Sequence, residues 1–242
     1  MGHVLLSKEV PNLTAPVTGI LASTLSVGSS VYLMENGTAV EYLVVNQGIP
    51  SASSLYDESC DGLWLLRKDI GFMQSFGSEN NSYKVSIPHD YLNNTVFPQY
   101  GSIEQSTIRS VKVPFVNGTG GSSVSTGSNG LSTKLFLLSG YEVGFTTSNN
   151  SYFPVDGALL SYFIAGVGSS AVDKRIGYYN GEVSDWWLRS PYQSGVGKSW
   201  EVYSDGKYKY LSVTNSRGIR PALVLPSNAL FDKNTLLLKG VA

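Results

Sequence analysis

Apolar residues occur along this chain in short blocks, separated by stretches rich in Gly, Ser and Asn. The clearest pattern covers residues 30–46, where two β-rich segments flank Asn36 and Gly37. An Asn-Gly pair readily takes the positive φ angles of a type I′ turn, so this run predicts a β-hairpin. The apolar blocks 63–67 and 134–138 predict two buried strands.

Residues 88–110 predict two short helices packed on a sheet, with a break between Pro98 and Gly101. Leu92, Val96 and Phe97 have near-helical spacing. The segment 111–115 then predicts a strand.

Two other segments predict loops. Residues 117–133 contain almost no large apolar side chain, so they predict a long surface loop. The turn-rich residues 48–61 predict a loop that carries Cys60.

Two segments near the C-terminal end, 185–191 and 218–223, combine tryptophan, arginine and proline. We call them the anchor segments. Trp186 and Trp187 point to opposite faces of an extended chain, so at least one should be buried. The guanidinium groups of Arg189 and Arg220 can stack on indoles and donate several hydrogen bonds. We expect the two segments to pair as strands, and these four side chains to be structural.

The anchor segments resemble the ending WWLRSP…G(V/I)RPAL of a family of bacterial and phage domains of uncharacterised function. Other pieces that match in order are 27–29, 41–45, 64–66, 91–93 and 134–139, so the resemblance covers roughly residues 25 to 228. The version that contains VEYLVVNQG and LYDESCDGLWLLRKDI is most similar to phage and prophage proteins. The resemblance implies a C-type-lectin-like fold, which formylglycine-generating enzymes and variable receptor-binding proteins of phage share.

We therefore expect an α+β, β-rich, C-type-lectin-like domain with about two short helices and long loops. Residues 1–25 would form an N-terminal arm or edge strand that contacts other subunits in an assembly. Residues 26–228 would form the domain, and residues 229–242 a tail or final strand.

The amino-acid composition disfavours several classes of function. Charged residues make up 14% of the chain and the net charge is −1, which is unlike a nucleic-acid-binding protein. Cys60 is alone, which excludes an internal disulfide, and we interpret it as a small packed residue. His3 and His89 are the only histidines, which disfavours a zinc site or a His-dependent triad. The ligand spacing of a calcium loop is absent, so no metal or cofactor is expected.

The chain contains no run of eighteen apolar residues, so we expect no membrane insertion. Residues 1–8 lack the features of a signal peptide. A protein without a signal peptide could reach the outside on a virion, or it could remain in the cytoplasm.

Residues 192–217 predict a binding hairpin, because they combine tyrosine and tryptophan with small polar residues, as antibody paratopes do. Two strands would flank Asp205 and Gly206, with Val202, Leu211 and Val213 facing inward. Trp200 would be exposed only if its strand begins after it. The candidate ligand-binding residues are Trp200, Tyr203, Asp205, Tyr208, Tyr210 and Asn215. The alternative is an ordinary Tyr-rich hairpin with some rings buried against neighbouring subunits.

From the resemblance we expect a non-enzymatic phage virion protein: a capsid decoration, head fibre or tail-tip subunit that binds host-surface carbohydrate or protein. Its partners would be other virion subunits and copies of itself, a trimer by analogy with viral surface proteins. It would be in the cytoplasm during assembly and on the particle surface afterwards. One alternative is a bacterial carbohydrate- or protein-binding module outside any virion. Another is a formylglycine-generating type of enzyme, which the single cysteine disfavours.

Overall fold

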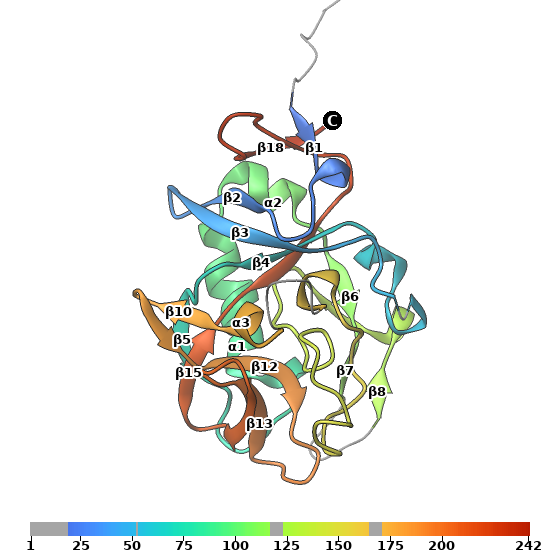
Figure 1. The fold of residues 1–242 in the computed structure, drawn as a ribbon, viewed down its shortest axis with the longest axis vertical. Coiled ribbons are helices and arrows are strands. Elements are labelled where there is room, and N and C mark those ends of the chain that lie inside the picture. Colours follow the sequence, from blue (N-terminus) through green and yellow to red (C-terminus); the bar gives the residue numbers. More distant parts are fainter. Residues whose placement is uncertain (1–18, 52, 117–122, 165–170) are drawn as a thin grey trace, which may run out of the picture.

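The computed structural model describes residues 19–51, 53–116, 123–164 and 171–242. It has a β-rich α+β fold with several sheets and a few short helices. Two sheets dominate, and Figure 1 shows them one above the other, with β1 and the C-terminus at the top. No helix in the described part of the chain is long and apolar enough to cross a membrane.

The upper sheet has four antiparallel strands in the order β16-β4-β3-β2. Its strands are β2 (Ser30–Glu35), β3 (Thr38–Gln47), β4 (Leu63–Arg67) and β16 (Ala222–Leu225). Asn36 and Gly37 connect β2 to β3 with φ angles of 48° and 78°. The predicted hairpin and the predicted strand 63–67 are therefore confirmed.

The lower sheet has five strands in the order β14-β13-β12-β15-β5. They are β5 (Phe72–Ser75), β12 (Trp186–Pro191), β13 (Lys198–Val202), β14 (Tyr208–Ser212) and β15 (Ser216–Ile219). The anchor segments meet here through the parallel pairing of β12 with β15, in which Trp186 lies opposite Gly218. The second anchor segment then passes through Arg220 and Pro221 into the upper sheet. It therefore connects the two sheets.

Smaller pairings complete the β-structure. β1 (Ile20–Leu21), β17 (Ala229–Phe231) and β18 (Leu238–Val241) form a three-stranded sheet. β10 (Gly177–Tyr179) pairs with β11 (Glu182–Ser184), β6 (Val111–Val113) with β9 (Leu131–Thr133), and β7 (Phe115–Val116) with β8 (Val124–Ser125). Residues 229–242 thus contribute two strands, and the part of the predicted arm before residue 19 lies outside the described residues.

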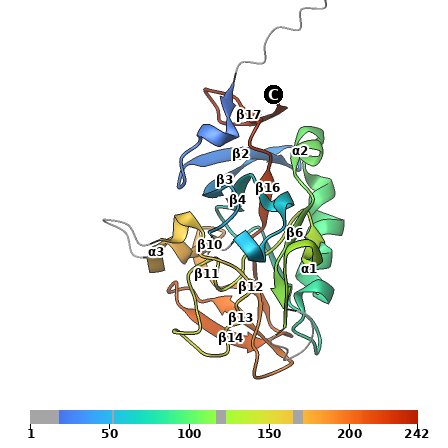
Figure 2. The ribbon, with the colours of Figure 1, turned by 90° about the vertical axis from the view of Figure 1, so that its right-hand side faces the viewer.

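Helical turns line one side of the molecule, where α1 and α2 lie one below the other (Figure 2). They are α1 (Ile87–Tyr91), a π-helical turn (Leu92–Val96), a 3-10 turn (Phe97–Gln99) and α2 (Ser102–Thr107). This confirms the two predicted helices and their break. A third helix, α3 (Ala171–Arg175), was not predicted. One-turn 3-10 helices cover Ala22–Thr24, Ser53–Leu55, Glu58–Cys60, Tyr83–Val85, Gly127–Asn129 and Ser161–Phe163.

Two predictions about the middle of the chain were wrong. Residues 134–138 are not a strand: Leu135, Phe136, Leu137 and Leu138 are fully buried, but only Phe136 makes a β-bridge, to Ala222. The segment is a buried irregular chain whose hydrogen bonds go largely to side chains. The described part of the predicted loop 117–133 contains β8 and β9, because Leu131 is buried and pairs with Val113.

All four tryptophans are fully buried. Trp186 and Trp187 point to opposite faces of β12, as expected, and each face is covered. The indole N–H of Trp186 donates to the carbonyl of Arg175 (2.9 Å), and that of Trp187 donates to the carbonyl of Gln74 (3.1 Å). Each ring is therefore held by a polar contact as well as by packing.

Arg189 is the centre of a buried polar network. Its guanidinium makes a bidentate ion pair with Glu142, with two N–O distances of 2.6 Å, and both side chains are fully buried. The remaining donors reach the carbonyl oxygens of Pro114, Leu137 and Asp156 at 2.9–3.0 Å. All five N–H groups of the guanidinium are thus used. One side chain on β12 thereby fixes three segments that have little regular structure.

Asp156 extends this network. Its carboxyl group is fully buried and accepts a hydrogen bond from the Ser190 hydroxyl (2.8 Å to Oδ2), which in turn accepts one from the amide of Gly140 (2.8 Å). Burial raises the pKa of Asp156 to about 7, because desolvation of the carboxylate outweighs the favourable effects of Arg189 and Ser190.

The ion pair yields a stability prediction. Glu142→Gln should lower the free energy of unfolding by about 3–5 kcal/mol, because it leaves the buried Arg189 charge without its counter-ion. Urea denaturation followed by tryptophan fluorescence measures this change. The control is Lys207→Gln, which breaks an exposed ion pair with Asp205 and should leave the unfolding midpoint unchanged. Equal midpoints for the two variants would contradict the role of the network.

Asp156 yields a pH prediction. In the unfolded chain its pKa should lie near the ordinary value of 3.8, so between that value and about 7 only the folded protein keeps the proton. The contribution of Asp156 to stability therefore decreases as the pH rises through this window. Asp156→Asn removes the titration but can still accept the Ser190 hydrogen bond. The unfolding free energy of the variant minus that of the wild type should increase between about pH 4 and about pH 7. A difference that stays constant with pH would show that Asp156 titrates normally.

Candidate binding site

The hairpin of β13 and β14 carries most of the predicted binding residues, and its register decides which face each one joins. Trp200 lies opposite Tyr210, and Val202 lies opposite Tyr208. Directly opposed residues point to the same face of a sheet. The four residues therefore share one face, whereas Glu201, Lys209 and Leu211 lie on the other. The prediction that Val202 and Leu211 share an inward face was wrong.

Trp200 was also predicted wrongly as a ligand-binding residue, because it is fully buried. β13 begins at Lys198, before Trp200, so the indole shares the inward parity of Val202. The Trp200 ring stacks on Phe153 with a centroid distance of 3.9 Å, and its N–H donates to the carbonyl of Tyr152 (3.3 Å). Replacing Trp200 would open a cavity in the core rather than remove a ligand contact.

An exposed aromatic surface lies over this indole. Tyr192 and Tyr210 stack with a centroid distance of 4.2 Å, and Tyr152 meets Tyr192 edge-on at 5.2 Å. The ammonium group of Lys198 lies 5.0 Å from the centre of the Tyr210 ring. Tyr152 and Tyr210 are 43% and 41% exposed, which leaves ring surface available to a ligand. We call Tyr152, Tyr192, Lys198 and Tyr210 the tyrosine platform.

A groove of about 360 Å³ adjoins the platform and is lined by Tyr208, Lys209, Tyr210 and, beneath them, Trp200. Because Trp200 has no exposed surface, the side chains of Tyr208 and Tyr210 form the accessible wall. Tyr208 is held in place by a hydrogen bond from its hydroxyl to the carbonyl of Asn149 (2.7 Å).

Asn81 positions the loop that presents Tyr192. Its side-chain amide donates to the carbonyl oxygens of Tyr192, Gly195 and Lys198 at 2.8–3.1 Å, and the side chain is fully buried. This residue comes from the segment that precedes α1, more than one hundred positions away in sequence. The platform is therefore built on a loop that a buried side chain holds in place.

The remaining predicted residues do not join this surface. Tyr203 lies under Lys209, whose ammonium group is 3.9 Å from the ring centre, on the other face of the hairpin. Asp205 caps the turn by accepting a hydrogen bond from the amide of Lys207 (2.9 Å), which also lowers its pKa. Asn215 lies in the next turn, where its side chain bonds to the carbonyl of Ser212 (3.3 Å). Of the predicted set, Tyr208 and Tyr210 lie at the candidate site, and Trp200 lies buried beneath it.

Sequence reasoning did not select Tyr152, Tyr192 or Lys198. Tyr192 and Lys198 lie in the stretch recognised as paratope-like. They stand at the two ends of the loop between β12 and β13, and this position could have selected them. Tyr152 lies in a segment without periodicity, so nothing in the sequence connects it with the hairpin.

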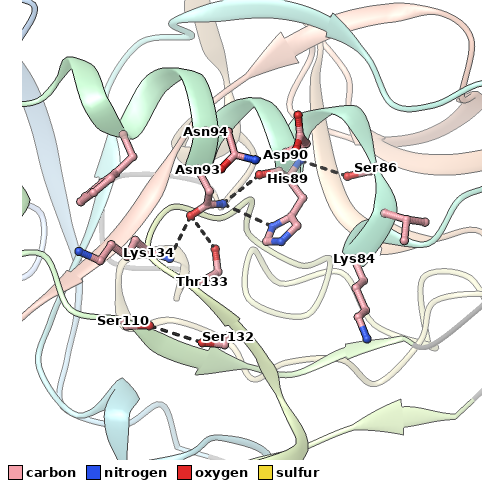
Figure 3. Close-up of a pocket in the computed structure, with 12 residues that line it drawn as sticks. Lys84, Ser86, His89, Asp90, Asn93, Asn94, Ser110, Ser132, Thr133 and Lys134 are labelled. Carbon is pink, nitrogen blue, oxygen red and sulfur yellow. Dashed lines mark hydrogen bonds between the residues drawn. The ribbon is translucent and has the colours of Figure 1, made fainter.

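A second surface feature is a polar cleft of about 540 Å³ beside α1 (Figure 3). Asn93, in the π-helical turn, crosses its floor. The Asn93 amide donates to the carbonyl groups of His89 and Leu135 at 2.9 Å, and its oxygen accepts from Thr133 and Lys134. Asn93 is thus a structural bridge between the helical side and β9, with its hydrogen bonds used inside the protein.

Ser86, His89 and Asp90 line the same cleft, but they do not form a catalytic relay. The Ser86 hydroxyl donates to the carbonyl of Tyr83 (2.8 Å) and accepts from the backbone amide of His89 (3.2 Å), as a helix N-cap does. The His89 ring packs edge-on against Tyr83, and burial lowers its pKa. The contacts of Ser86 are therefore those of a cap.

Cys60 is fully buried, and its thiol contacts the carbonyl of Lys112 (3.3 Å). Desolvation raises its pKa to about 12, so the thiol is protonated at neutral pH. Among the described residues, no group of three or more His, Cys, Asp or Glu side chains is arranged to hold a metal ion.

No curated protein and no solved structure significantly matches this chain. A family model described as a domain of unknown function, DUF6273, matches residues 61–227, which is more than half of the chain. The match includes both anchor segments, Asn81 and the whole tyrosine platform. The predicted membership of an uncharacterised domain family is confirmed, whereas phage origin and the C-type-lectin relationship stay predictions. The chain belongs to the DUF6273 family.

Proposed function

We propose that this domain is a non-enzymatic recognition module that binds carbohydrate on the tyrosine platform. The observation that carries this proposal is the exposed stack of Tyr192 on Tyr210, with Tyr152 at its edge and the groove of about 360 Å³ beside it. Sugar rings present apolar C–H faces that pack on aromatic rings, while their hydroxyl groups need nearby polar partners. Lys198 and the tyrosine hydroxyls supply such partners.

Rigidity supports the same proposal. Tyrosine offers a large contact area with few rotatable bonds, so little conformational entropy is lost on binding. Trp200 and Phe153 support the platform from below, and Asn81 fixes the loop that carries Tyr192. The surface is therefore organised before a ligand arrives.

The position of the platform also favours recognition. β13 and β14 lie at the end of the molecule opposite β17 and the C-terminus (Figure 2). A domain joined to a larger assembly near the chain ends would present this end outward. We extend the proposal to a phage virion protein with a C-type-lectin-like fold, as the sequence resemblance implies. A bacterial binding module outside any virion would use the same surface.

The test is a glycan array probed with the full chain, followed by calorimetric titration of any glycan that binds. Tyr210→Ala and Tyr152→Ala should each weaken binding roughly tenfold, which corresponds to about 1.4 kcal/mol of lost aromatic contact. The matched control is Tyr178→Ala, because Tyr178 is 44% exposed but lies on β10, away from the platform. All three variants should melt within a few degrees of the wild type.

The proposal fails if no glycan binds, or if Tyr210→Ala and Tyr178→Ala bind equally well. Light scattering distinguishes the competing role of the platform as a subunit interface. If Tyr210→Ala converts an oligomer to monomers, the platform contacts another copy of the chain instead of a sugar.

A further inference from the structure

Arg220 differs from the other buried arginines in having an unsatisfied donor. Its Nε donates to the carbonyl of Arg67 (2.8 Å), and its guanidinium carbon lies 5.2 Å from the centre of the Trp186 ring. Its Nη1 is buried and has no hydrogen-bond partner. Among the described residues, three buried side-chain polar atoms lack a hydrogen-bond partner. The other two are a carboxylate oxygen and an amide oxygen, so Nη1 of Arg220 is the only donor among them.

Arg220 also has no ion-pair partner in the described part of the chain, although Asp69 lies close enough to attract its charge. Arg189 is paired with Glu142, and Arg217 lies within 3.2 Å of Asp185 and Glu201, but no carboxylate of the described chain forms an ion pair with Arg220. Only 2% of the residue is exposed. Desolvation lowers the pKa of Arg220 to about 10, which still leaves the group charged at neutral pH. A buried charge of this kind is costly unless something pairs with it.

A pocket of about 180 Å³ leads to this residue from the surface. Arg220 is the only buried residue in its wall; Lys68, Asp69, Tyr162 and Lys174 lie nearer the mouth. Lys174 is held close by a hydrogen bond to the carbonyl of Ile164 (2.9 Å) and by its position over the Tyr162 ring. At about 30 Å³ per water molecule, the pocket has room for roughly six waters, or for one small polyatomic anion.

We propose that this pocket binds an oxyanion, either a phosphate group or a carboxylate, with the Arg220 guanidinium as its principal partner and the Lys174 ammonium as a second. A planar guanidinium suits either anion, because two parallel N–H donors match two oxygens. The oxyanion would supply the missing acceptor for Nη1 and a counter-charge in direct contact with the guanidinium. Asp69 and Asp173 also line the pocket, so an anion must be held by direct contact with Arg220 rather than by the net charge of the wall.

This site is independent of the tyrosine platform, which lies on the β13–β14 hairpin. Arg220 lies where the chain passes from β15 to β16, between the two main sheets. An anion bound here would contact the segment that joins those sheets, so binding should stabilise the whole fold.

The test measures the melting temperature and the tryptophan fluorescence of the full chain as sodium phosphate or sodium acetate replaces sodium chloride at constant ionic strength. We expect a saturable rise in melting temperature with at least one oxyanion, together with a fluorescence change, because Trp186 underlies Arg220. A response to phosphate alone assigns a phosphate group, and a response to acetate alone assigns a carboxylate.

Two variants of the pocket and one control locate the site. Lys174→Ala should weaken the apparent affinity roughly fivefold, as expected for one partly exposed charge contact. Arg220→Lys keeps the charge but loses the paired donors, and should abolish saturation. The control, Lys84→Ala, removes a lysine from the polar cleft and should change nothing. If Arg220→Lys does not fold, Lys174→Ala and Lys174→Glu still test the site. The apparent affinity of Lys174→Glu for the oxyanion should then be lower than that of Lys174→Ala.

The proposal is overturned if neither oxyanion gives a saturable response beyond that of chloride. It is also overturned if Lys174→Ala responds like the wild type, or if Lys84→Ala removes the response. The last result would place the anion in the polar cleft.

Discussion

The bidentate pair between Arg189 and Glu142 is the interaction on which the rest of this fold depends. Much of the chain between β9 and β12 has no regular structure, so its backbone groups need partners other than neighbouring strands. Arg189 supplies five donors in a fixed planar arrangement, and Glu142 also accepts from Tyr56 and from the amide of Ser139. An irregular segment in the core is tolerated because these side chains replace the hydrogen bonds of a sheet. The arrangement is a costly one, since both charges are desolvated, and it is stable only while the set is complete.

The same framework positions both proposed sites. β12 carries Trp186, Trp187 and Arg189 inside the protein, and the loop that follows it carries Tyr192 to the surface. Trp186 packs beneath Arg220 on one side of that strand. The platform and the Arg220 pocket are therefore separate surfaces attached to one rigid element. A fold can host many unrelated functions, so the functional argument rests on these surfaces and not on the architecture.

Sequence reasoning recovered the elements whose signals are local. The Asn36-Gly37 turn, the strand at 63–67 and the broken helix after Pro88 all follow from residues close together in the chain. It failed where the decisive partner is remote. Residues 134–138 have the composition of a strand, but most of their hydrogen bonds go to the side chains of Arg189, Tyr83 and Asn93, and only Phe136 makes a β-bridge to a neighbouring strand. Trp200 was placed at the surface because the sequence did not define the residue at which β13 begins. A shift of one residue moves a side chain to the other face. Tyr152 reaches the platform only through tertiary packing, which one sequence does not reveal.

Hydrogen exchange of individual backbone amides tests the central role of the Arg189 network most directly. The amides of Ser139 and Gly140 bond to the side chains of Glu142 and Ser190, and the amide of Arg189 bonds to the carbonyl of Leu138. If the network holds this irregular core, these three amides should exchange only through global unfolding, as slowly as those of β4. Exchange of the Ser139 and Gly140 amides through local opening, much faster than exchange in β4, would contradict the account.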